Sequence, residues 1–147
     1  MDQTTPPTEG GSRPVARTLK AVAQGALGAV LLFAGTSHLT SAREEFQAQV
    51  PSWFPVDPDT VVVVSGAVEI ALGSALLLVW KQPHRRRLGL AVAAFFLAVF
   101  PGNIAQFLEH KDGFGLDTDA KRLARLPFQV LLIAWALWST RTARREH

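Results

Sequence analysis

The sequence predicts an all-α integral membrane protein, a bundle of four transmembrane helices in one domain. Three apolar runs carry this prediction: Ala21–Leu39 and Leu88–Leu108 contain no Asp, Glu, Lys or Arg, and Val61–Trp80 contains only Glu69. Their lengths match the roughly 20 residues that cross about 30 Å of hydrocarbon. A soluble domain of 147 residues has no core deep enough to bury three such runs on every side. The pattern therefore excludes a soluble enzyme.

The fourth span is less obvious, because the apolar run Leu126–Ser139 is short. Its length of about 21 Å, at roughly 1.5 Å per residue, does not reach across the hydrocarbon. A helix that begins near Thr118 or Asp119, both good N-cap residues, would add the missing turns. Trp135 and Trp138 are then expected to anchor the far end at the membrane interface.

The flanking segments are predicted to be tails. Residues 1–18 are rich in Pro, Gly and Thr, a composition typical of disorder, so they are expected to form a disordered cytoplasmic tail. Residues 19–140 form the transmembrane domain, and residues 141–147 form a basic cytoplasmic tail. A cleaved signal peptide is the alternative interpretation of the first apolar run. That run is longer than a usual signal core and no small-x-small cleavage site follows it, which favours an uncleaved helix.

The first connection, residues 40–60, is predicted to lie along the membrane surface and to cap one end of the bundle. Ser41 and Glu44 have the spacing of a capping box, which predicts a short helix over Ala42–Gln49. Trp53 and Phe54 suit a membrane interface.

The charge distribution predicts the orientation. Lys and Arg concentrate in the two tails and in the second connection, which contains Lys81 and Arg85–Arg87. By the positive-inside rule both termini are expected in the cytoplasm. Arg85–Arg87 have no predicted role beyond this topology. The net charge of +3 does not indicate nucleic-acid binding, because no basic stretch is interleaved with aromatic residues.

Glu69 is the most informative single residue. A carboxylate at mid-span costs about 2.5–3.5 kcal/mol on insertion scales, so it is expected to face another helix or a cavity. Gly66 and Gly73 share its helix face, where a neighbouring helix can approach closely. The alternative is a protonated glutamic acid that only hydrogen-bonds a neighbouring helix.

The remaining polar residues group at one depth. Pro101 leaves the Leu97 carbonyl without its helical donor, so polar groups are expected nearby. In the inner half, Gln24 and Ser74 are nearly the only polar residues. Simple alternatives exist, such as an interfacial histidine or glutamine and an arginine that snorkels to the headgroups. The predicted site lies in the outer half of the bundle and comprises His38, Glu69, Asn103, Gln106, Arg125 and Gln129.

This set of groups predicts a ligand site and no catalytic residue. Glu69 is expected to pair with Arg125 or with His38, and that proximity would keep it ionised. A histidine, a glutamate and amide donors beside lipid suit a quinone carbonyl or a small polar solute. One histidine and one glutamate are too few for a metal site. The absence of cysteine excludes disulfides, a thiol relay, Cys-ligated zinc and iron–sulfur clusters built from this chain.

Several short motifs occur in a fixed order. AGTSHL at 34–39 is followed by VPSWFP at 50–55, SGAVEI at 65–70, FPGNI at 100–104 and RLPFQ at 125–129, with IAW at 133–135. In this order and spacing they resemble the DoxX-like family of small bacterial membrane proteins, over about residues 19–139. Gly102 departs from the family, where a small residue such as Ala is expected.

The resemblance implies a four-helix transmembrane bundle. Some DoxX-like relatives are subunits of thiosulfate:quinone oxidoreductase, and others are tied to membrane redox stress. Without cysteine, this chain cannot carry persulfide or disulfide chemistry itself. The motifs contain His38, Glu69, Asn103, Arg125 and Gln129, the residues that the depth argument selects.

The leading functional prediction is a redox-associated membrane subunit that binds a quinone or a small polar ligand. In that scheme Glu69 and His38 handle the proton, Asn103 and Gln129 hydrogen-bond the carbonyl, and Arg125 sets the local field. Reduced thiosulfate or a partner redox protein would supply electrons, and a homo-oligomer is the other expected association. The first alternative is a structural or scaffolding protein whose polar residues only join helices. The second is a small-solute carrier, for which no inverted repeat is visible.

Overall fold

The computed structural model describes residues 11–142, and this part of the chain consists of helices and connections without strands. The helices are α1 (Ser12–Leu39), α2 (Arg43–Gln47), α3 (Pro58–Leu78), α4 (His84–Leu108) and α5 (Asp119–Thr140). The predicted disordered tail, residues 1–18, is therefore wrong in part, because residues 12–18 are helical. The predictions for residues 1–10 and 143–147 lie outside the described residues.

Four of the helices, α1, α3, α4 and α5, are long and apolar enough to cross a membrane by length and composition. Their surfaces are apolar, with Phe33 77% and Leu78 78% exposed, whereas the polar Gln24 and Gln129 are buried. Apolar side chains outside and polar side chains inside are typical of helices packed within lipid. The predicted all-α four-helix bundle is confirmed.

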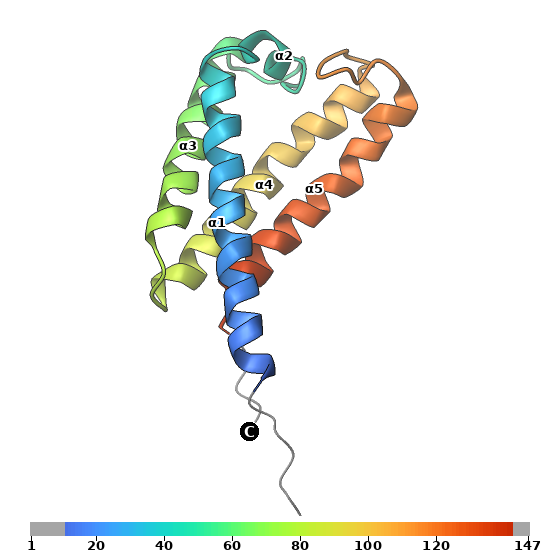
Figure 1. Cartoon of the computed structure of the whole chain (residues 1–147). Helices are drawn as coiled ribbons and strands as arrows, with labels where there is room; N and C mark the ends of the chain where they lie inside the picture. Colours follow the sequence, from blue (N-terminus) through green and yellow to red (C-terminus); the bar gives the residue numbers. More distant parts are fainter. Residues whose placement is uncertain (1–10, 143–147) are drawn as a thin grey trace, which may run out of the picture.

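Glycines determine how closely α1 and α3 pack. A Cβ on Gly66 would lie 2.9 Å from the Gly35 carbonyl oxygen, and one on Gly73 would lie 2.8 Å from that of Gly28. Real Cβ atoms do not come so close, so the two backbones touch only because these positions lack side chains. The close approach predicted on the Gly66–Gly73 face is confirmed, and it places α1 and α3 side by side (Figure 1).

The second pair, α4 and α5, packs in the same way. Gly89 has no room for a Cβ against the Thr140 hydroxyl of α5. The indole nitrogen of Trp135 donates a hydrogen bond of 2.8 Å to the Ala23 carbonyl of α1. Trp135 therefore joins α5 to α1. Trp138 is 48% exposed, and the Lys20 ammonium lies 5.7 Å from its ring centroid.

The two pairs meet at one end of the bundle and separate towards the other, where α2 and the connection 109–118 lie (Figure 1). We call this end the α2 end and the opposite one the Arg85 end. Near the Arg85 end the pairs share an apolar core that includes Leu27, Leu76, Val92 and Ala136. The separation at the α2 end leaves space between the pairs, roofed by the two connections.

The helix starts follow the sequence signals in α5 but not in α2. Thr118 caps α5, and its hydroxyl accepts a hydrogen bond from the Lys121 N–H. The fourth span therefore begins where the sequence predicts. The predicted short helix forms as α2, but the capping box is wrong: α2 begins at Arg43, and Ala42 provides no side-chain cap.

Candidate functional site

A cavity of about 750 Å³ lies between the two helix pairs, beneath the connections at the α2 end. All four long helices and both connections contribute to its wall. Most of the wall is apolar, and aromatic rings form much of it. The aromatic lining residues are Phe46, Trp53, Phe54, Phe96, Phe114, Phe128 and Trp135.

On the α1–α3 side, the cavity is lined by His38 and Glu69, which are 6% and 8% exposed. His38 Nδ1 lies 3.2 Å from Glu69 Oε2, within ion-pair distance. The two atoms are not aligned as a hydrogen bond, and neither has another partner among residues 11–142. The His38 ring also packs edge-on against Phe46 of α2, with centroids 3.5 Å apart. Of the two partners expected for Glu69, His38 is the one in contact.

On the α4–α5 side, the lining groups are Asn103, Arg125 and Gln129. The Gln129 amide nitrogen donates a 2.7 Å hydrogen bond to the Phe96 carbonyl, and its oxygen accepts from Arg125 Nη1 at 3.2 Å. Asn103 Nδ2 lies 3.5 Å from the same oxygen. Gln129 thus bonds a backbone carbonyl of α4 near Pro101. This carbonyl belongs to Phe96, one residue before the Leu97 carbonyl that the sequence indicates. The Gln129 side chain also orients Arg125.

Three buried side-chain atoms have no hydrogen-bond partner within residues 11–142: His38 Nδ1, Glu69 Oε2 and Asn103 Oδ1. All three belong to residues that line the cavity, and they come from both of its sides. A buried polar atom without a partner costs about 1–3 kcal/mol, so such atoms call for an explanation. His38 Nδ1 and Glu69 Oε2 lie at ion-pair distance from each other, whereas Asn103 Oδ1 has no such partner among these residues.

Five of the six predicted site residues line this cavity, and Gln106 does not. Gln106 is 1% exposed, and its amide nitrogen donates at 3.3 Å to the Lys111 carbonyl in the connection after α4. One helical turn therefore separates two roles: Asn103 faces the cavity, whereas Gln106 holds the connection.

The roof of the cavity is fixed by contacts between the two connections. Glu109 accepts hydrogen bonds from the Ser52 hydroxyl at 2.7 Å and from the Ser52 N–H at 3.1 Å, and it pairs with Lys111 at 2.8 Å. Lys111 also donates to the Val50 carbonyl at 2.7 Å. The hydrogen bonds from Lys111 and Ser52 lower the pKa of Glu109 from 4.5 to about 2. The carboxylate form therefore holds the roof together.

Arg122 supports the connection 109–118 from below. Its side chain is buried and pairs with Asp112 and with Asp119, and it donates at 3.0 Å to the Lys111 carbonyl. Its structural role depends on the course of the connection, which the sequence pattern does not reveal.

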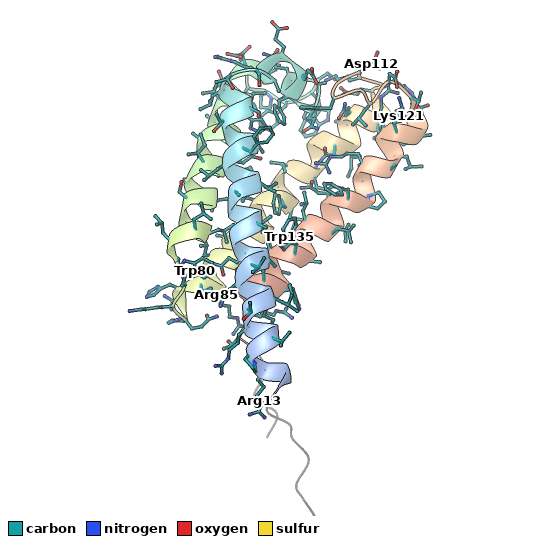
Figure 2. All side chains as sticks on the ribbon, viewed as in Figure 1. Arg13, Trp80, Arg85, Asp112, Lys121 and Trp135 are labelled. Carbon is teal, nitrogen blue, oxygen red and sulfur yellow. The ribbon has the colours of Figure 1, made fainter. Side chains whose placement is uncertain are left out.

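The Arg85 end holds a polar cluster that the sequence did not predict. Gln24 is fully buried and donates 2.9 Å hydrogen bonds to the carbonyls of Leu76 and Val79 at the end of α3. Its oxygen accepts from Arg85 Nε, and Arg85 Nη2 donates at 2.8 Å to the Ser139 carbonyl. Figure 2 shows Arg85 beside Trp80 at this end of the bundle. Arg85 therefore joins α1, α4 and α5, beyond its predicted part in topology.

With this geometry in place, comparison with known proteins gives one match. Residues 27–140 match a family model described as a domain of unknown function (DUF8561). The chain belongs to the DUF8561 family. No curated protein and no solved structure matches the chain. Every residue that lines the cavity lies within the DUF8561 region, whereas Gln24 of the Arg85-end cluster precedes it.

Within that region, the donor set fits an organic ligand better than a metal ion. The described residues contain no group of three or more His, Asp or Glu placed to hold a metal. The cavity instead offers an apolar body of aromatic rings and a few converging polar groups, as small-molecule sites typically do.

Proposed function

We propose that this protein is a membrane subunit that binds an amphipathic small molecule, with a quinone as the leading candidate, in the cavity at the α2 end. The observation that carries the proposal is the convergence on one largely apolar cavity of three buried polar atoms without a hydrogen bond, two of which, His38 Nδ1 and Glu69 Oε2, form an ion pair with each other. A ring compound with polar oxygens and an apolar tail matches both features. Binding would satisfy the polar atoms and fill the aromatic pocket.

Each lining residue has a defined task in this scheme. Gln129 and Arg125 already share a hydrogen bond, so Arg125 is held where it can donate to a ligand oxygen. Asn103, whose amide lies beside Gln129, contacts the same ligand head from α4. His38 and Glu69, 3.2 Å apart, can hold or pass a proton on the opposite side of the cavity.

The redox role rests on the resemblance to the DoxX-like family. The motifs of that resemblance contain the five predicted site residues that line the cavity. In this proposal the electrons come from a reduced sulfur compound such as thiosulfate or from a partner redox protein. The proposed location is the bacterial inner membrane, with both termini in the cytoplasm and the α2 end outside.

A structural role is the second candidate, and one contact favours it. His38 and Glu69 bridge α1 and α3 beside the glycine contacts, so the pair can also serve as interhelical glue. The two candidates differ in what a Glu69→Gln change does. An amide preserves the shape and a hydrogen bond, so a structural role tolerates it, whereas a proton-handling role does not.

The test is a titration with decylubiquinone, a quinone with a short apolar tail, in liposomes. Trp53 and Trp135 line the cavity, so bound quinone should quench tryptophan fluorescence saturably. We expect Glu69→Gln to weaken this saturable component by about tenfold or more, equal to about 1.4 kcal/mol. Glu44→Gln is the matched control, because Glu44 is exposed on α2 and does not line the cavity. Equal saturable quenching in all three proteins would refute the assigned role of Glu69, and its absence in the wild type would refute quinone binding.

A further inference from the structure

The roof at the α2 end is closed by several independent contacts between the two connections. Besides the Ser52–Glu109 and Lys111–Val50 bonds, the Phe114 N–H donates at 2.8 Å to the Glu45 carboxylate. Gly102 lies so close to the Gln49 carbonyl that a Cβ would not fit. These contacts hold the two connections together at this end, where Trp53 and Phe54 also line the cavity and are 70% and 40% exposed.

The side of the cavity between α1 and α5 is built differently. Val30 of α1 and Phe128 of α5 both line the cavity and are 47% and 51% exposed. We call these two side chains, which belong to the two helices on this side, the α1–α5 edge of the cavity. This edge therefore consists of apolar side chains, and no hydrogen bond links α1 to α5 there among the described residues.

The depth of this edge places it in the apolar part of the bundle. Val30 is nine residues from the α2-end terminus of α1, and Phe128 is nine residues from that of α5. At roughly 1.5 Å per residue, both lie about 13 Å below the helix ends. Exposed neighbours on the same helices, Phe33 and Leu131, are apolar as well. In the proposed membrane location, a molecule at this edge would be in contact with hydrocarbon.

Arg125 adds a polar group beside the edge. Its guanidinium carbon lies 5.2 Å from the centroid of the Phe128 ring, and its Nη1 bonds Gln129 inside the cavity. A ligand head that passes Phe128 therefore meets Arg125 first and then Gln129 and Asn103. The apolar remainder of the ligand can stay between α1 and α5.

We propose that the cavity is loaded from the lipid and not from the aqueous side: its ligand is a membrane-dissolved amphiphile that enters between α1 and α5, past Val30 and Phe128. This inference rests on the proposed ligand site and narrows the ligand to molecules that partition into the bilayer. The roof contacts stay intact during entry, and Phe128 is the side chain that moves.

The test uses the lack of cysteine in the chain. Ser65 lines the cavity from α3, so Ser65→Cys introduces a single thiol there. In lipid nanodiscs, where both faces are open to water, we would compare labelling by N-cyclohexylmaleimide, which partitions into lipid, and by an anionic sulfonated methanethiosulfonate. Each rate is divided by the rate of the same reagent with the SDS-unfolded protein.

Three variants in the Ser65→Cys background locate the route. Val30→Trp should obstruct the edge, and Val22→Trp is its matched control, because Val22 is exposed on the same helix but does not line the cavity. Phe128→Ala should widen the edge, so it keeps the test informative if Val30→Trp does not fold.

The expected result is that the normalised maleimide rate exceeds the methanethiosulfonate rate by about tenfold or more, a factor that corresponds to about 1.4 kcal/mol in access. Val30→Trp should slow the maleimide and Phe128→Ala should accelerate it, while Val22→Trp leaves it unchanged. Equal normalised rates for the two reagents would overturn the inference, and so would maleimide rates that neither edge variant changes. Labelling needs no quinone, so the two tests can fail separately. A failure of decylubiquinone to bind would refute the proposed function. The labelling rates would still decide the route of entry.

Discussion

His38 Nδ1 and Glu69 Oε2 face each other 3.2 Å apart across the α1–α3 interface, with no other hydrogen-bond partner for either atom among residues 11–142. The glycines at 35 and 66 bring the two backbones into contact beside this pair. This buried pair has incomplete hydrogen bonding and lies at the wall of a cavity. Such pairs are typical of sites where stability is given up for function. The predictions below separate the residues that hold the bundle from those that hold the ligand.

The glycine contact between α1 and α3 should be intolerant of a single methyl group. A Cβ on Gly73 would lie 2.8 Å from the Gly28 carbonyl oxygen, so Gly73→Ala forces the helices apart and should cost about 1–3 kcal/mol. Gly25→Ala is the control, because nothing lies within 4 Å of its Cβ position; it should gain about 0.5–1 kcal/mol from helix propensity. Unfolding in SDS or by heat measures both. Equal stabilities of the two variants would contradict the packing described for α1 and α3.

Of the three arginines at positions 85–87, Arg85 is the one on which the stability of the Arg85 end should depend. Arg85→Ala removes the donor to the buried Gln24 oxygen and to the Ser139 carbonyl. Groups left unsatisfied in this way cost about 1–3 kcal/mol. Arg87→Ala should change stability little, since Arg87 is exposed and makes no side-chain hydrogen bond among the described residues. The comparison of the two unfolding midpoints is decisive, and a larger effect of Arg87→Ala would argue against the cluster.

Asn103 and Gln106 should show opposite effects, although both are buried amides on α4. Asn103→Leu removes an unpartnered oxygen, so stability should stay equal or rise by up to about 1 kcal/mol, while ligand retention falls. Gln106→Leu loses the hydrogen bond to Lys111 and should be less stable with ligand retention intact. Thermal unfolding and decylubiquinone titration on the same samples provide both measurements. If both variants lose stability and binding together, the assignment of separate roles is wrong.

The roof should loosen in acid. The pKa of Glu109 is lowered in the folded protein to about 2, from 4.5, mainly by Lys111 and Ser52. A lowered folded pKa means that the contact stabilises the roof fully above pH 4.5 and is lost as the pH falls towards 2. Emission from Trp53, the residue next to Ser52, should change across this window in the wild type. Glu109→Gln should lack this transition, and an identical transition in that variant would assign it to another group.

The fold was largely predictable from the sequence because the bilayer constrains it so strongly. Apolar length fixed three spans, and the Thr118 cap fixed the start of the fourth. The close α1–α3 approach followed from the glycines around Glu69. The capping box at Ser41 failed because α2 starts at Arg43, and the carboxylate of the neighbouring Glu45 instead accepts from Phe114. A local pattern does not anticipate such contacts with a distant segment.

The site was predictable in composition but not in detail. Depth along the helices grouped His38, Asn103 and Gln129 correctly at one level, because a helix rises by a constant amount per residue. Depth alone does not say which way a side chain points, so Gln106 was grouped with them although it holds a connection. The roles of Arg85 and Arg122 depend on which helix ends meet, and tertiary packing alone determines this.

The measurement that tests the central claim most directly is native mass spectrometry with lipid extraction. It would be applied to the wild type and to Glu69→Gln, both purified in mild detergent. We expect a bound adduct of quinone size in the wild type that is lost or strongly reduced in Glu69→Gln, with little change in thermal stability. Absence of any adduct from a folded wild type, together with a less stable Glu69→Gln protein, would contradict it. Glu69 would then be a structural residue that joins α1 to α3.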